Sequence, residues 1–281
     1  MSRVAVVTDS TAYLPDGVAV SSQITVVPLH VVLGGWSGKE AVEVSPSDVA
    51  SALGERRVQV TTSRPTPGQL AAAYRATGAS HIVSVHLSSQ LSGTADSARL
   101  AAQQVAVEGI EVRVVDSRSV AMGLGFPVMA AAEAAAGGAD LDAVVSATVG
   151  AVRSTTTMLY VDTLEHLRRG GRVTATAALV GAALGVKPLL LVKDGQIVLL
   201  EKVRTFSKAL ARLEELAVAA AGDGPVELAV HHLAAPERAT RLADDLRTAL
   251  PHRRSMYLSE VGAVVGAHVG PGCLGVVLWR R

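Results

Sequence analysis

The sequence predicts an α/β protein with two domains: an N-terminal, Rossmann-like domain built on a parallel sheet and a C-terminal domain built on a mixed sheet. The chain has 281 residues, which is long enough for two domains of ordinary size. Short apolar runs alternate with helical stretches in the first half, a pattern typical of a parallel sheet with helices on both faces. The second half contains a hairpin signal, which indicates antiparallel strands. A helix expected over 141–152 closes the first half, so we place the domains at 1–152 and 153–281.

In the first half, apolar runs predict the strands and capping residues mark the helices. Thr66, followed by Pro67 and Gln69, has the pattern of a helix start with a capping box. Pro28 interrupts the second apolar run. The expected strands are Arg3–Thr8, Ile24–Leu33, His81–Leu87 and Val112–Val115. The expected helices are Ser47–Leu53, a helix from Pro67, Ala95–Val107 and the Ala-rich Phe126–Ala136.

The second half changes in character. Asp194-Gly195, between the runs Leu189–Lys193 and Gln196–Val203, is the clearest hairpin signal in the chain. Asp162 is in position to cap a helix over Thr163–Arg169. Further strands are expected at Thr155–Val161 and Val226–Val230 and near the C-terminal end, and further helices at Phe206–Ala220 and Pro236–Leu250.

The composition excludes several classes of protein. Lys and Arg number 26 against 25 Asp and Glu, so no basic surplus exists for a nucleic-acid binder that depends on counterion release. Aromatic residues make up only 3% of the chain, which predicts an aliphatic core. The single Cys273 excludes an internal disulfide and any Cys-rich metal site. His231-His232 is the one histidine pair, but neighbouring side chains on a strand point to opposite faces, and we expect neither a metal nor a cofactor.

One uncharged window, 261–279, has the appearance of a membrane span. Gly262, Gly266 and Gly270 even have the spacing of a transmembrane packing motif. Pro271 lies in the middle of the window and breaks any helix there. We therefore expect a cytoplasmic protein without an integral membrane segment.

Hydroxyl side chains gather where predicted strands end. Ligands of open α/β sheets bind at the carboxyl ends of the strands, and the amides at a helix N-terminus favour an anion. Thr62, Ser63 and Ser92, with the amides of Gly93 and Thr94, form a candidate site for a carboxylate or a phosphate. The alternative is that each hydroxyl only caps a helix or closes a turn.

Two further residues have two interpretations each. His268 precedes Gly270-Pro271-Gly272 and is either a pH-tunable donor to a ligand that approaches the backbone closely or a hydrogen-bonded core histidine in a tight turn. Arg172 follows Gly170-Gly171 and is either a charge that complements a helix C-terminus or an exposed anchor for a partner.

Seven segments, in this order along the whole chain, resemble the DegV family, the fatty-acid-binding subunits of bacterial fatty acid kinase. Each alone is a weak signal, whereas all seven in register are specific. They are VTDST (7–11), TSRPTP (62–67), LSSQLSGTADSA (87–98), VVDSRSVAMGLG (114–125), DTLEHLRRGGR (162–172), KP with DG (187–195) and HVGPGCLG (268–275).

The resemblance implies a two-domain α/β fold that buries a long-chain, palmitate-like fatty acid. By the same resemblance, Thr62, Ser63, Ser92 and His268 lie at the carboxylate, and Arg172 engages a separate kinase subunit. That kinase phosphorylates the acid to an acyl-phosphate, which this subunit carries to phospholipid synthesis, so the chain is expected to have no catalytic residue of its own. Two alternatives remain: a binding protein for another anionic lipid, and an autonomous acyl or phosphoryl transferase that uses Ser92 with His268 as base.

The chain departs from the family pattern at two positions. Tyr13 stands where an acidic residue is common, and Arg64 stands where Gln is common. Arg64 adds a cation beside the expected head-group site, which raises the question of a different or additional anionic group there.

Overall fold

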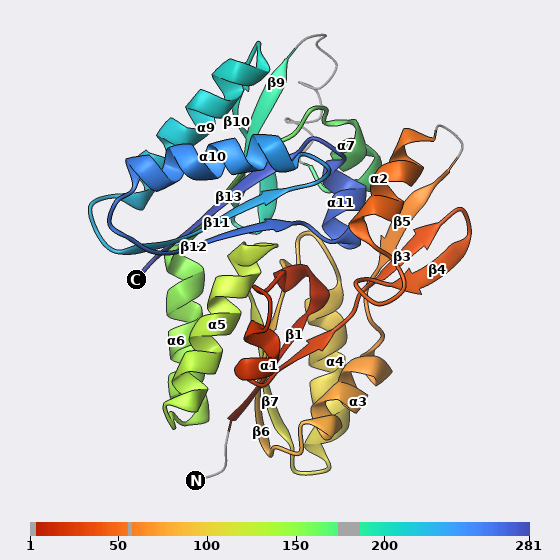
Figure 1. Ribbon diagram of the computed structural model, residues 1–281. Helices are drawn as coiled ribbons and strands as arrows, with labels where there is room; N and C mark the ends of the chain where they lie inside the picture. The colour runs from red at the N-terminus through yellow and green to blue at the C-terminus, as the bar shows by residue number, and fades with distance from the viewer. Residues whose placement is uncertain (1–3, 56–57, 174–185) are drawn as a thin grey trace.

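Three sheets form the framework of the computed structural model, which describes residues 4–55, 58–173 and 186–281. Arg3, the first residue of the first predicted run, lies outside the described residues. Figure 1 shows a parallel sheet with its helices in one half of the molecule, a larger sheet in the other half and a small third sheet beside them. The α/β class expected from the sequence, with one parallel and one mixed sheet, is confirmed.

The parallel sheet has helices on both faces, as the alternating pattern predicted. Its strands have the order β2-β1-β6-β7 and all run parallel. Val6 and Val83 pack toward α5 and α6, whereas Val7 and Ile82 pack toward α3 and α4. The strands are β1 (Val4–Asp9), β2 (Ile24–Val27), β6 (His81–His86) and β7 (Glu111–Asp116). The helices are α3 (Pro67–Ala76), α4 (Thr94–Ala106), α5 (Met122–Ala136) and α6 (Leu141–Ser154), with η1 (Ser10–Ala12) and α1 (Val18–Ser21) after β1.

A small antiparallel sheet replaces part of one predicted strand. The run Ile24–Leu33 divides at Pro28, so that β2 ends at Val27 in the parallel sheet and β3 begins at His30 in another sheet. Proline cannot donate a ladder hydrogen bond and therefore ends a central strand. The small sheet has the order β4-β3-β5, from β3 (His30–Leu33), β4 (Trp36–Lys39) and β5 (Val60–Ser63), beside α2 (Pro46–Gly54).

The mixed sheet has six strands in the order β10-β9-β8-β13-β11-β12. Only β11 and β12 pair in parallel; the other neighbours are antiparallel. Asp194 and Gly195 both have positive φ, which fits the predicted hairpin turn. The strands are β8 (Thr155–Tyr160), β9 (Lys187–Lys193), β10 (Gln196–Val203), β11 (Val226–His232), β12 (Arg253–Glu260) and β13 (Leu274–Arg280).

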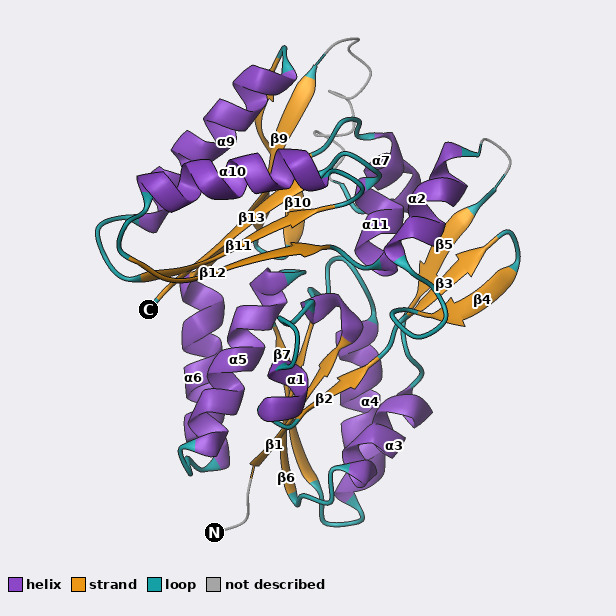
Figure 2. Ribbon diagram, viewed as in Figure 1, coloured by secondary structure: helices purple, strands orange, loops and turns teal. Residues whose placement is uncertain are grey.

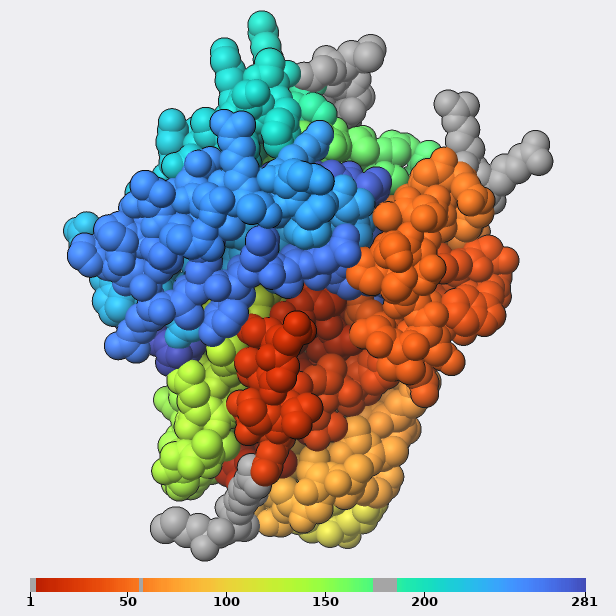
Figure 3. All heavy atoms as spheres, in the orientation of Figure 1, coloured from red at the N-terminus to blue at the C-terminus, as the bar shows by residue number. Residues whose placement is uncertain are grey.

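Helices α9 (Phe206–Ala221) and α10 (Pro236–Ala249) cover one face of the mixed sheet (Figure 2). The opposite face packs against α5 and α6, where Met122 and Phe126 meet Val277 and Trp279. Helix α6 ends at Ser154 and β8 begins at Thr155. The division into domains at residue 152 stays a prediction. In the space-filling view of Figure 3, the two halves are in close contact along this junction.

One expectation for the second half is wrong and another is met. Asp162 does not cap the helix: α7 (Glu165–Gly170) has Leu164 as its N-cap, with no side-chain bond. Asp162 instead accepts from Tyr160 at 2.5 Å and from Lys187 at 2.9 Å, because a charged partner outcompetes a cap. In the uncharged window, α11 (Ala263–Val269) ends before Pro271, as expected. None of the helices described here is long and apolar enough to cross a membrane.

A buried carboxylate joins the elements that surround the small sheet. Glu40, directly after β4, is 1% exposed. Its Oε1 accepts from the Tyr13 hydroxyl at 2.9 Å and from the Val264 amide at 2.7 Å, and its Oε2 accepts from the Ser10 hydroxyl. Burial raises the pKa of this carboxyl. Ser10 and Tyr13 follow β1, and Val264 begins α11, so one side chain ties α11 to two sheets.

We expect Glu40→Ala to lower the free energy of unfolding by about 3 kcal/mol or more, because it leaves the buried Val264 amide and the half-buried hydroxyls of Ser10 and Tyr13 without an acceptor. Glu40→Gln keeps an acceptor and removes the buried charge, so its loss should not exceed about 1 kcal/mol. Urea denaturation measures both, with the exposed Glu55→Ala as control, for which a change within about 0.5 kcal/mol is expected. Equal losses for Ala and Gln at position 40 would contradict the role of the acceptor.

Candidate functional site

A cavity of about 350 Å³ lies between the parallel sheet, the small sheet and the mixed sheet. This volume is within the range of small-molecule sites. Its walls are almost entirely aliphatic, and among the lining residues that the structure describes there is no Asp or Glu. The walls come mainly from Leu29, Leu87, Leu91, Leu159, Leu167, Val192, Ile197, Val261, Val264, Val265, Val269 and Val277.

The inner face of the mixed sheet forms one wall. Thr157 and Leu159 on β8 line the cavity, as do Gly275 and Val277 on β13. These residues alternate along their strands, and the register pairs Thr157 with Val277 and Leu159 with Gly275. Alternate residues of a strand share a face, so a continuous wall results on the side away from α9 and α10.

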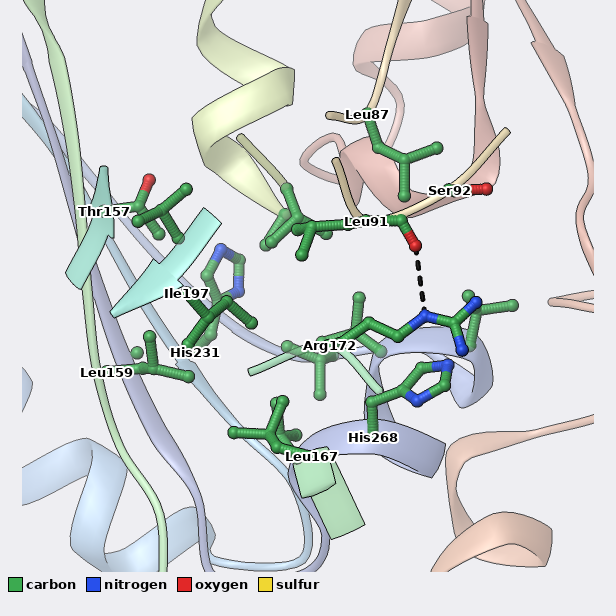
Figure 4. A pocket seen from close by; sticks show the side chains of 18 of the residues that line it. Leu87, Leu91, Ser92, Thr157, Leu159, Leu167, Arg172, Ile197, His231 and His268 are labelled. Atoms are coloured by element: carbon green, nitrogen blue, oxygen red, sulfur yellow. Dashed lines mark hydrogen bonds between the residues drawn. The ribbon is translucent and has the colours of Figure 1, made fainter. Parts of the chain in front are cut away.

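The predicted hydroxyl groups come together at one end of the cavity, which we call the head end. Thr62 and Ser63 arrive from β5, and Ser92 and Gly93 from the loop before α4. Thr62 Oγ1 lies 2.9 Å from Nε2 of His268, although the two residues are 206 positions apart. Figure 4 shows Ser92 and His268 on one side of the cavity, with Thr157 and Leu159 on the other.

Thr94 does not reach the cavity. It is fully buried at the first position of α4, and its Oγ1 lies 2.9 Å from Oγ of Ser92. The helix places Thr94 behind Ser92, where its hydroxyl orients the serine. The sequence places the amide of Thr94, rather than its side chain, at the candidate anion site, and that role stays a prediction.

His268 lies in the last turn of α11, not in a loop or tight turn as the sequence suggested. Burial, and secondarily the positive charge of Arg172, lowers the pKa of His268 to about 4. The imidazole is therefore neutral at pH 7 and can donate or accept at Nε2. Gly170 makes room for this ring, since a Cβ there would overlap Nδ1 of His268.

Arg172 is half-buried and lines the cavity, which differs from the expectation of an exposed anchor. Its Nε donates to the carbonyl of Leu91 at 3.1 Å, and its Nη1 donates to the carbonyl of Gly170. Figure 4 shows the bond between Arg172 and Leu91, with the guanidinium beside His268. The side chain thus joins the loop before α4 to the end of α7, and its docking role remains a prediction.

The other end of the cavity contains a histidine that the sequence analysis treated only as half of a metal pair. His231 is 2% exposed and lines the cavity. Its Nδ1 lies 3.1 Å from Oγ of Ser259, and its Nε2 accepts from the amide of Met122 at 3.3 Å. Burial lowers the pKa of His231 to about 4. His232 faces away from the cavity, toward Glu260. The alternation of side chains along β11 was the one feature of the sequence that could have indicated an inward-facing residue in this pair.

A buried chain of polar groups supports the loop that carries Ser92. Oδ2 of Asp9 lies 3.0 Å from Nδ1 of His86 and accepts from the amide of Leu87 at 3.0 Å. Nε2 of His86 contacts the hydroxyl of Ser84, which contacts that of Tyr74. Asp, His and Ser are the types found in hydrolytic triads, but these residues have no exposed surface and none lines the cavity. They fix the end of β6, from which the loop continues.

The buried His231 predicts a pH-dependent stability. Its pKa is about 4 in the folded chain and about 6.5 in the unfolded chain, so its contribution is complete above pH 6.5 and is lost as the pH falls toward 4. Between pH 7 and pH 5 this amounts to about 2 kcal/mol. His231→Gln should remove that part of the pH dependence in urea denaturation, whereas the exposed His252→Gln should keep it. An unchanged slope in His231→Gln would contradict the assignment.

Known proteins are similar to this chain in both sequence and fold. The sequence model of the DegV family matches residues 3–281. A DegV domain-containing protein of Streptomyces coelicolor is 54% identical, with 100% of each chain covered. A DegV family protein from Thermus thermophilus, whose structure is described as one of fatty acid binding, has a TM-score of 0.93 at 31% identity and covers 99% of this chain and 100% of its own. DegV from Bacillus subtilis, described as a fatty acid binding protein, has a TM-score of 0.91 at 34% identity, with 100% of each chain covered. With this match over nearly its whole length, the chain belongs to the DegV family.

Proposed function

We propose that this chain binds a long-chain fatty acid, with the hydrocarbon tail in the aliphatic cavity and the carboxylate at the head end. The observation that carries the proposal is the division of one cavity into aliphatic walls and a head end that gathers Thr62, Ser63, Ser92 and His268. The polar groups at the other end, Thr157 and His231, are hydrogen-bonded within the protein. Relatives with the same fold are described as fatty acid binding. A ligand with a long apolar tail and one small polar head matches this division.

The tail supplies most of the affinity. A palmitate-like chain has about fifteen methylenes, each contributing about 0.8 kcal/mol when buried, or about 12 kcal/mol in total before the costs of association. The head end then fixes the direction in which the acid lies. Thr62, Ser92 and the neutral His268 offer hydrogen bonds without a bidentate ion pair, and a carboxylate held in this way keeps more of its nucleophilic character.

The proposed role is to present that carboxylate to a separate kinase subunit in the cytoplasm. The kinase transfers a phosphoryl group to the carboxylate, and the resulting acyl-phosphate feeds phospholipid synthesis. The groups that catalyse phosphoryl transfer belong to the partner. The proposed docking residue is Arg172, which joins the loop before α4 to the end of α7 beside the head end.

Nothing in the geometry favours an autonomous transferase that uses Ser92 with His268 as base. Ser92 bonds to Thr94 and His268 bonds to Thr62, and over the part of the chain that the structure describes, no hydrogen bond joins Ser92 to His268. A nucleophile and its base need to be within hydrogen-bond reach.

Removal of a head-end hydroxyl should weaken binding of the acid. For Thr62→Val and for Ser92→Ala, we expect the dissociation constant of palmitate to rise by about tenfold, because each loses a hydrogen bond to a charged group. Thr62→Ser, which keeps the hydroxyl, should bind within about threefold of the original chain by isothermal titration calorimetry. If Thr62→Val and Ser92→Ala both bind palmitate normally, the head group is not held where we place it.

Arg172→Ala tests whether Arg172 docks the kinase subunit. Because Nε and Nη1 of Arg172 already donate to the carbonyls of Leu91 and Gly170, we expect palmitate affinity to change by less than about threefold. Acyl-phosphate formation with the kinase subunit and ATP, trapped as the hydroxamate, should fall by about tenfold or more. A large loss of palmitate affinity would instead assign Arg172 to the ligand.

A further inference from the structure

We propose that Arg64 forms a second anion subsite at the mouth of the cavity, which binds a phosphoryl group attached to the head of the ligand. The inference rests on the proposed function and deepens it: the subsite holds the product, an acyl-phosphate, after the carboxylate site has held the substrate.

Arg64 lies next to the proposed carboxylate site, on the side that faces the solvent. It lies two residues after Thr62, just beyond the end of β5, and it lines the cavity while its side chain remains exposed. The guanidinium lies against Gly93, where a Cβ would overlap Nη1. The glycine between Ser92 and Thr94 therefore allows a cation to lie at the start of α4.

Among the residues that the structure describes, Arg64 has no compensating partner. Within residues 4–55, 58–173 and 186–281, no carboxylate or carbonyl accepts a hydrogen bond from it and no ion pair includes it, although most arginines of the chain are paired. Arg172, the other arginine that lines the cavity, already donates to Leu91 and Gly170. A free guanidinium at the mouth of a cavity whose described lining has no acidic side chain favours an anionic ligand group.

A carboxylate alone does not use this charge. In the proposed function, Thr62, Ser92 and the neutral His268 hold the carboxylate, without Arg64. A phosphoryl group adds about −1.5 to −2 charge at pH 7 and three acceptor oxygens. Arg64 matches that charge, and α4, whose N-cap Gly93 provides no side-chain cap, adds free backbone donors beside it. The pair of subsites thus fits a carbonyl with a phosphoryl group attached to it.

The test compares two ligands that differ at the head. Hexadecyl phosphate serves as a stable analogue of the acyl-phosphate, and palmitate represents the substrate; calorimetry at low salt gives both dissociation constants. Arg64→Gln should weaken hexadecyl phosphate by about tenfold or more and change palmitate by less than about twofold. Arg99→Gln, an exposed arginine on α4 that pairs with Asp96, is the matched control and should change neither.

The pH dependence gives a readout that a merely structural role would not move. The second ionisation of a phosphate has a pKa of about 6, so the affinity of the original chain for hexadecyl phosphate should rise between pH 5.5 and pH 7.5. In Arg64→Gln this rise should be clearly smaller, because the guanidinium is gone and only the backbone donors of α4 remain. A rise of equal size in both proteins would overturn the proposal.

The remaining outcomes separate this proposal from the proposed function. If Arg64→Gln weakens palmitate and hexadecyl phosphate equally, or weakens neither, the subsite does not exist. If neither ligand binds the original chain, the proposed function itself fails. Inorganic phosphate distinguishes the source: absence of binding supports a phosphoryl group attached to the tail, whereas binding that Arg64→Gln abolishes assigns Arg64 to free phosphate and overturns the attachment.

Discussion

The arrangement of the site depends on one buried carboxylate. Glu40 follows the small sheet and accepts hydrogen bonds from Ser10 and Tyr13, which follow β1, and from the amide of Val264 at the start of α11. The other end of α11 carries His268 to Thr62 on β5. Because a helix of this length is rigid, fixing its first turn fixes the position of the imidazole in its last turn. Gly262 is part of the same joint, since a Cβ there would overlap Oε1 of Glu40.

The cavity separates two kinds of interaction that a fatty acid requires. Apolar walls from the mixed sheet, from α7 and α11 and from the neighbouring loops supply an affinity that depends on area and has little direction. The head end supplies direction through a few hydrogen bonds. The polar groups at the far end, Thr157 and His231, are already bonded to Ser119, Ser259 and Met122. They therefore do not compete with the head end for a charged group, and the cavity favours one orientation of a ligand that has a charged head.

Charge increases outward along this direction. The head-end groups Thr62 and Ser92 are neutral, and burial keeps His268 neutral as well. Arg172 is charged but engaged by carbonyls, and Arg64 at the mouth is charged and exposed. This arrangement fits the proposed function, in which the ligand gains negative charge at its outer end on phosphorylation and the inner contacts need not change.

The sequence alone determined the α/β class and the local elements, since these depend on residues close to one another along the chain. The capping box at Thr66 and Gln69 and the hairpin at Asp194-Gly195 were predicted in this way, and the hydroxyl clusters marked Thr62 and Ser92. Tertiary structure decided which residues meet. Pro28 divides one apolar run between two sheets, Asp162 turns from its helix to Lys187, Thr94 lies behind Ser92, Arg172 bonds to Leu91, and His231 faces the cavity. Each of these outcomes depends on a partner from another element, and sequence periodicity contains no information about such contacts.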